Sequence, residues 1–198
     1  MRITGGRVKG RLLASPNGLN IRPTTDRVRE AIFSIIGQDL TGLKVLDLFA
    51  GTGCLGIEAL SRGALYAFFI DNSRQSINLM MKNLALCGYR SSKAICRRDL
   101  RKGIPMSHPL IRDGFDLIFL DPPYGKDLIP LLLEKFSMRN LLSPRARVVT
   151  ESSKTDVLPV STGNLEMVDT RSYGNTRIST YANAITGSCF TAQGSPGI

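Results

Sequence analysis

The chain has 198 residues, of which 42% are hydrophobic and 21% are charged, and its formal net charge is +10. This composition fits one globular α/β domain and excludes a disordered chain, and no apolar run approaches the ~20 residues that span a bilayer. Because residues 1–6 lack the apolar segment of a secretory signal, we expect a cytoplasmic protein.

Few residues are available for metal binding or for a histidine-based triad. The cysteines at positions 54, 87, 96 and 189 form no Cys-x-x-Cys pair, and His108 is the only histidine. We therefore expect no metal site and reduced cysteines. The excess of cations instead predicts attraction to the phosphate backbone of a nucleic acid.

Residues 1–23 form a basic segment that contains no acidic residue. Turn signals at 5–6 and 16–18 predict a small β-hairpin appendage. A helix should follow, beginning at Asp26 after a Thr24 or Thr25 cap and ending at Gly37. An edge hairpin can carry cations simply to block aggregation. The unbalanced charge favours RNA binding instead, with the candidate residues Arg7, Lys9, Arg11, Arg22, Arg27 and Arg29.

Residues 44–56 carry the first chemical signal. An apolar run over 45–49 predicts a buried parallel strand, Gly51-Thr52-Gly53 predicts a tight turn, and apolar residues from 55 to 60 predict a helix. This order is typical of a nucleotide-like ligand site at the carboxyl edge of a sheet, although the same glycines also occur in turns that bind nothing. Asp47 interrupts the strand, and its charge would repel a pyrophosphate and attract a cation. We therefore favour S-adenosylmethionine over NAD.

Acidic residues also follow the next two predicted strands. The strand at 65–70 ends at Asp71, where a carboxylate can accept hydrogen bonds from ribose hydroxyls, and a helix should cover 73–87. The strand at 94–96 precedes Asp99, which can accept a hydrogen bond from an adenine amine. The alternatives are a helix cap for Asp71 and a solvated loop acid for Asp99.

A fourth strand, predicted at 115–120, ends in Asp121-Pro122-Pro123-Tyr124. The Asp121 carboxylate and the Pro122 carbonyl can accept hydrogen bonds from an exocyclic base amine and so orient its lone pair toward a sulfonium methyl. The two prolines stiffen the loop, and Tyr124 offers an aromatic face to an extruded base. A rigid acidic turn without catalytic function is the alternative.

The remaining sequence predicts a helix at 128–136, a strand at 147–150, and late strands at 164–173 and 176–181 joined by a turn at 174–175. From residue 182 to 198 charges and periodicity are absent, which predicts a flexible tail. We expect a basic appendage at 1–23, one catalytic domain at 24–181 and the tail at 182–198.

Five segments together resemble the RsmD-type bacterial 16S rRNA guanine-N2 methyltransferases, a family of class I amino-methyltransferases. The segments are residues 22–30, 47–53, 56–64, 121–124 and 173–176. The resemblance covers residues 1–181 and implies a Rossmann-like α/β fold with a seven-stranded, mostly parallel sheet, an inserted final strand and helices on both faces. It also implies S-adenosylmethionine as cofactor and 16S rRNA or the assembling small ribosomal subunit as partner. We expect a monomer that does not bind membranes.

The resemblance also assigns roles to individual residues. Target-base contacts would come from Asp121, Pro122, Pro123 and Tyr124. Cofactor contacts would come from Asp47, Phe49, Ala50, Gly51, Thr52, Gly53, Asp71, Asn72, Asp99 and Leu100. One departure is Ser73, because the family often has a second acid two positions after the ribose-binding one. The tail after residue 181 has no counterpart in the family.

Three other functions stay open at this stage. The same fold can methylate a different acceptor, such as adenine N6 in DNA or a protein amide. The chain can also be a non-catalytic RNA-binding module with a vestigial cofactor site. An NAD-dependent oxidoreductase is the third alternative.

Overall fold

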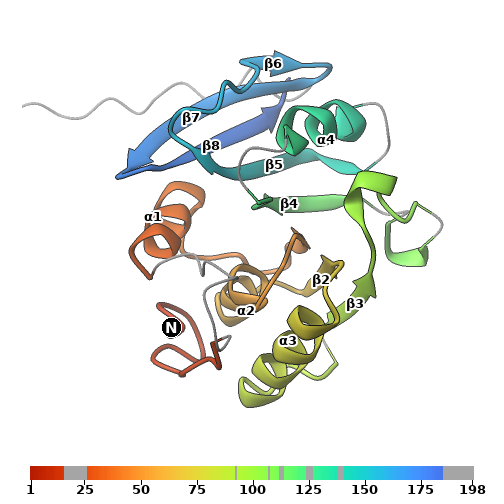
Figure 1. Cartoon of the computed structure of the whole chain (residues 1–198). Coiled ribbons are helices and arrows are strands. Elements are labelled where there is room, and N and C mark those ends of the chain that lie inside the picture. Colours follow the sequence, from red (N-terminus) through yellow and green to blue (C-terminus); the bar gives the residue numbers. More distant parts are fainter. Residues whose placement is uncertain are drawn as a thin grey trace, which may run out of the picture.

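The computed structural model describes residues 1–15, 26–91, 93–106, 108–111, 114–123, 127–137 and 141–184. Four α-helices, two short 3-10 helices and eight strands lie within these ranges (Figure 1). In chain order they are α1 (Asp26–Ile36), β1 (Lys44–Leu48), α2 (Cys54–Ser61), β2 (Tyr66–Asp71), α3 (Arg74–Leu86), β3 (Lys93–Arg97), η1 (Leu100–Lys102), η2 (Pro109–Ile111), β4 (Phe115–Leu120), α4 (Leu128–Ser137), β5 (Leu142–Ser153), β6 (Ser161–Thr162), β7 (Leu165–Tyr173) and β8 (Thr176–Asn183).

The strands form one mixed sheet in the order β3-β2-β1-β4-β5-β8-β7-β6. The first five are parallel, and β8 is inserted antiparallel between β5 and β7. The predicted α/β fold with an inserted final strand is therefore confirmed. The number of strands was wrong: the described residues contain eight rather than seven, because the two-residue β6 pairs with β7.

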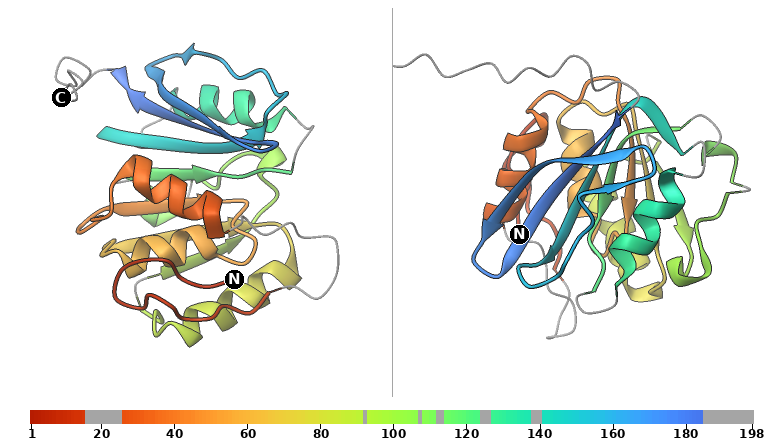
Figure 2. Two further views of the ribbon diagram at one scale, coloured as in Figure 1. Left: turned by 90° about the vertical axis from the view of Figure 1, so that its left-hand side faces the viewer. Right: turned by 90° about the horizontal axis from the view of Figure 1, so that it is seen from above.

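Helices cover both faces of the sheet, and alternate strand residues face the two layers. Val45 and Phe119 pack in the core beneath α1, α2 and α3. Leu46 and Ile118 point the other way, into the core beneath α4. Figure 2 shows α1 and α2 on one side of the sheet and α4 on the other. Because these strands are covered on both faces, they appear in the sequence as near-continuous apolar runs.

The sheet order places β1 and β4 side by side at its centre. From β1 the chain first builds outward through β2 to β3, and then from β4 outward through β5. The carboxyl ends of β1 and β4 therefore lie at the point where the strand order reverses. Ligands of open α/β sheets bind in the crevice at this point.

The N-terminal segment is tied to the domain more closely than an appendage would be. Within the described residues 1–15, the predicted hairpin is reduced to a single bridge between Arg2 and Leu12. Ile3 and Leu13 are buried in the core beneath α1 and α2, and the Arg7 N–H donates to the Ser61 carbonyl at 2.7 Å. These contacts contradict a separate hairpin. The predicted boundary at residue 23 lies outside the described residues.

Other predicted elements agree with the structure at most boundaries. Ser73 caps α3 by accepting a hydrogen bond from the Ser76 N–H, and β7 and β8 meet at the predicted turn. The fifth strand is longer than predicted and runs from 142 to 153. The predicted start of the tail at residue 182 was wrong, because Ala182 and Asn183 pair with β5 and β7 as the end of β8. The rest of the predicted tail, from 185 onward, and the caps Thr24 and Thr25 lie outside the described residues. In the ranges that the structure covers, no helix has the length and apolarity to cross a membrane.

Candidate active site

The loop from 49 to 53 joins β1 to α2 in a tight turn. Phe49, Gly51 and Gly53 all have positive φ, at 60°, 53° and 76°. A Cβ atom on Gly53 would lie 2.8 Å from the Cγ atom of Met80. Glycine is thus required at 53 both by the left-handed backbone and by the close approach of α3. Ala50 and Thr52 are buried within the same loop.

Asp47 lies beneath this loop and is 2% exposed. Its carboxylate accepts a hydrogen bond of 2.9 Å from the Gly56 N–H in the first turn of α2. A Cβ on Gly56 would lie 2.3 Å from the ring of Phe69 and 3.0 Å from the Asp47 carboxylate. Burial raises the pKa of Asp47 to about 7; the Gly56 hydrogen bond opposes the increase, and the charge of Asp71 adds to it.

Asp71 connects the end of β2 to the same loop. One carboxylate oxygen accepts from the Gly51 N–H and the other from the Ser73 N–H, each at 2.8 Å. Asp71 therefore fixes both the glycine loop and the turn before α3, whereas the helix cap that the sequence left open for it is Ser73. Each oxygen keeps a further lone pair, so a ribose-binding role stays a prediction. Asn72 is exposed beside it.

The expected adenine-binding residues lie one strand farther out, after β3. Asp99 accepts hydrogen bonds from the backbone and side chain of Arg101, and its contact with the Arg101 Nη2 atom is 2.7 Å long. The Arg101 hydrogen bond lowers the pKa of Asp99 to about 2. Leu100 is buried in the core beneath α4. Nothing in these contacts tests an adenine role for either residue.

The second predicted centre lies beside the glycine loop. Leu48 and Leu120 are paired in the parallel register of β1 and β4, so Phe49 and Asp121 follow at neighbouring strand ends. Burial raises the pKa of the Cys54 thiol to about 11, and the charges of Asp47 and Asp121 add to this increase. The register thus places Asp121 beside the start of the glycine loop. Tyr124 lies outside the described residues.

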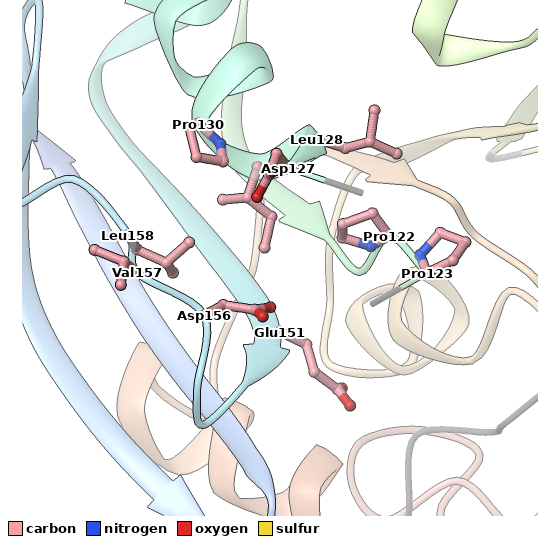
Figure 3. Close-up of a pocket in the computed structure, with 10 residues that line it drawn as sticks. Pro122, Pro123, Asp127, Leu128, Pro130, Glu151, Asp156, Val157 and Leu158 are labelled. Carbon is pink, nitrogen blue, oxygen red and sulfur yellow. The ribbon is translucent and has the colours of Figure 1, made fainter. Parts of the chain in front are cut away.

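The sequence analysis missed Glu151, which lies at the end of the adjacent strand. Glu151 is 6% exposed, and it follows Thr150, the register partner of Leu120 on β4. An open pocket with about 340 Å³ of empty space lies here (Figure 3). It is lined by Pro122, Pro123, Asp127, Leu128, Ile129, Pro130, Glu151, Asp156, Val157 and Leu158. The available signal was an acid directly after a predicted strand, a position that Asp71 and Asp121 also have.

Most of the described RNA-binding candidates are exposed. Arg7, Lys9 and Arg11 lie on the N-terminal segment, and Arg27 lies on α1. Their side chains are therefore accessible to a polyanion, and an RNA-binding role stays a prediction. Arg22 lies outside the described residues.

The prediction for Arg29 was wrong. Its side chain is fully buried, and its guanidinium donates to Glu58 at 3.2 Å, to Asp26 at 2.8 Å and to the Arg2 carbonyl. A group that is enclosed by its own ion pairs is not available to RNA. Arg29 instead joins α1, α2 and the N-terminal segment.

Comparison with known proteins gives a consistent result. A family model described as conserved hypothetical protein 95 matches residues 1–182. The chain is 36% identical over 181 residues to the putative rRNA methyltransferase YlbH of Bacillus subtilis, covering 91% of this chain and 98% of that protein. It is 32% identical over 168 residues to the ribosomal RNA small subunit methyltransferase D of Escherichia coli, covering 83% and 80%. Among solved structures, the putative methyltransferase yhhF from Escherichia coli matches with a TM-score of 0.79 and 30% identity, over 92% of this chain and 97% of that one.

Proposed function

Because this chain belongs to the RsmD-type family of bacterial rRNA methyltransferases, described as conserved hypothetical protein 95, we propose that it methylates the N2 amine of a guanine in 16S rRNA. The methyl donor is S-adenosylmethionine. The observation that carries this proposal is the adjacency of the glycine loop and Asp121 at the ends of two paired central strands. Methyl transfer requires a donor site and an acceptor site that meet in this way.

The loop residues fit a cationic cofactor. Asp47 is a buried carboxyl that accepts a hydrogen bond from the Gly56 N–H, and its pKa of about 7 reflects the cost of burying its charge. A ligand that carries an ammonium or sulfonium group would offset this cost. Asp47, Gly51 and Gly53 would hold the methionine part, and Asp71 the ribose. When bound, S-adenosylmethionine supplies an electrophilic methyl group.

Asp121 would then orient the acceptor. The lone pair of an exocyclic amine is shared with the ring, and a carboxylate that accepts from one N–H helps to direct it toward the methyl carbon. As the new N–C bond forms and the C–S bond breaks, the amine gains positive charge, which the Asp121 carboxylate stabilises. The amine then loses one proton to that carboxylate and onward to water. Pro122 is buried and Pro123 follows it, so the loop is stiff before the substrate arrives.

The test is transfer of a radiolabelled methyl group to small-subunit RNA or particles from a strain that lacks the enzyme. Mass spectrometry of the product should place one 2-methylguanosine in 16S rRNA. Cofactor binding without incorporation into any RNA would contradict the proposal and favour a non-catalytic RNA-binding module. Incorporation into DNA adenine or a protein amide instead would retain the methyltransferase and change the acceptor.

A further inference from the structure

We infer that Glu151 is a specificity-determining residue that recognises the N1–H group of the target guanine. This inference rests on the proposed function. It assigns a role to a carboxylate that was not among the sequence-predicted site residues.

The register places Asp121 and Glu151 side by side. Leu120 on β4 pairs with Thr150 on β5, so the two acids occupy the next position on neighbouring parallel strands. Side chains alternate between the two faces of a sheet. Phe119 and Val149, two positions earlier, both pack in the core beneath α1 and α2. The alternation therefore directs Glu151 to the face of the sheet that also contains Asp47, and Asp121 follows β4 directly beside it.

Glu151 is also placed for contact with a ligand. It is 6% exposed and lines the pocket formed partly by Pro122 and Pro123 of the candidate catalytic loop (Figure 3). A second acid in this pocket, Asp156, accepts a hydrogen bond of 3.0 Å from the Ser153 N–H and so stabilises its own turn.

A guanine presents donors that two neighbouring carboxylates can accept. Its Watson–Crick edge presents N1–H and the two N–H bonds of the N2 amine, all hydrogen-bond donors. Adenine presents an unprotonated N1 at the corresponding position, which a carboxylate would repel. With Asp121 on the amine and Glu151 on N1–H, the pair would select guanine over adenine. One such contact typically changes discrimination between bases by about 5- to 150-fold.

The test uses 2-aminopurine, which keeps the reactive amine and lacks N1–H. After the methylated guanine has been mapped, RNA with guanine or 2-aminopurine at that position is prepared by ligation, and kcat/KM is measured for both. For the unsubstituted protein we expect guanine to be preferred by about tenfold or more. Glu151→Ala should reduce this preference to near one, mainly through loss of activity on guanine.

Two further variants make the result interpretable. Glu151→Gln keeps the shape and one acceptor oxygen, so it should retain an intermediate preference for guanine. It also provides a measurement if the alanine variant does not fold. Glu166→Ala removes an exposed acid from β7 and should leave the preference unchanged. If the preference for guanine over 2-aminopurine stays unchanged in both Glu151→Ala and Glu151→Gln, the inference about Glu151 is wrong and the proposed function stands. If the unsubstituted protein does not methylate guanine, both the proposed function and the inference about Glu151 are wrong.

Discussion

The carboxylate of Asp47 accepts a 2.9 Å hydrogen bond from the backbone N–H of Gly56, which joins the centre of the sheet to the first turn of α2. The contact is possible only because Gly56 has no side chain, since a Cβ would lie 3.0 Å from the carboxylate. Asp47 is buried at the same time, and its pKa is raised to about 7. The charge of this carboxyl group thus changes within the physiological pH range.

We predict that the affinity for S-adenosylmethionine rises with pH through 7. A cationic ligand favours the charged carboxylate, and in the free protein Asp47 is mostly protonated at pH 6 and mostly ionised at pH 8. The dissociation constant measured by calorimetry should therefore fall about tenfold over this range. Asp47→Asn should bind more weakly and lose this pH dependence.

Unfolding experiments on the two proteins provide the control. The pKa of Asp47 is higher in the folded state than in the unfolded chain, so the contribution of this residue to stability is greatest below pH 4 and declines as the pH rises to 7. Asp47→Asn should remove that decline and be relatively more stable at pH 8. Parallel stability curves for both proteins would mean that the Asp47 pKa is not raised.

We predict that Gly56→Ala weakens both folding and cofactor binding. The new methyl group would lie 2.3 Å from the Phe69 ring, and such overpacking typically costs about 1–3 kcal/mol. It would also displace the Asp47 carboxylate. Gly88→Ala is the matched control, because its Cβ meets nothing within 4 Å and only its φ of +80° is strained. A loss of stability in both variants, with lower cofactor affinity only in Gly56→Ala, is the expected result from denaturant unfolding and calorimetry.

The central fold could be predicted because buried parallel strands have a simple sequence pattern. β1, β2 and β4 are covered on both faces, and each appears as a mostly apolar run. β5 was predicted too short because its first part includes exposed residues, such as Pro144 and Arg145, before the buried run begins.

The errors at the N-terminus have a different cause. Arg29 is one of several charges in a short basic stretch, and its ion-pair partner Glu58 is 29 residues away in the sequence. Local patterns do not reveal such a partner, so Arg29 was assigned to the surface. For the same reason the helix α2 was expected to be amphipathic, whereas all its residues are buried, partly because the N-terminal segment packs against it.

We predict that Glu58→Gln strongly destabilises the protein. The fully buried carboxylate accepts from Thr4 Oγ1 at 2.9 Å and the Gly5 N–H at 2.7 Å, and it pairs with Arg29 and Arg62. A neutral amide would remove the countercharge of Arg62 and leave Arg29 with Asp26 alone, and breaking such buried ion pairs typically costs about 3–5 kcal/mol. Denaturant unfolding measures this loss.

The exposed acid Glu30 on α1 provides a matched control for that substitution. Glu30→Gln should change the free energy of unfolding by no more than about 0.5 kcal/mol. Similar stabilities for the two glutamine variants would mean that the buried network contributes little to the attachment of the N-terminal segment.

We predict that replacing Arg7, Lys9 and Arg11 with alanine weakens RNA binding and reduces its salt dependence. Each phosphate contact to single-stranded RNA contributes about 0.7 to the slope of log K against log salt, so losing three should reduce its magnitude by about 2. Fluorescence anisotropy at several salt concentrations measures the slope. Lys154→Ala, on the exposed turn after β5, is the control cation. If the slope does not change in the triple variant, these three residues do not bind RNA phosphates, and the N-terminal segment has a structural role.

We predict that Asp121→Asn lowers kcat for methyl transfer by about 100-fold or more while changing cofactor affinity by no more than about twofold. The amide keeps the shape and one acceptor oxygen but lacks the negative charge that stabilises the amine as it becomes positive. Asp121 follows β4, whereas the hydrogen bonds that hold the glycine loop and the start of α2 are accepted by Asp71 on β2 and Asp47 on β1, so the loop should be retained. Calorimetry and single-turnover kinetics separate the two effects. If both parameters fell equally, Asp121 would belong to the cofactor site, and the target amine would have to be oriented by another group.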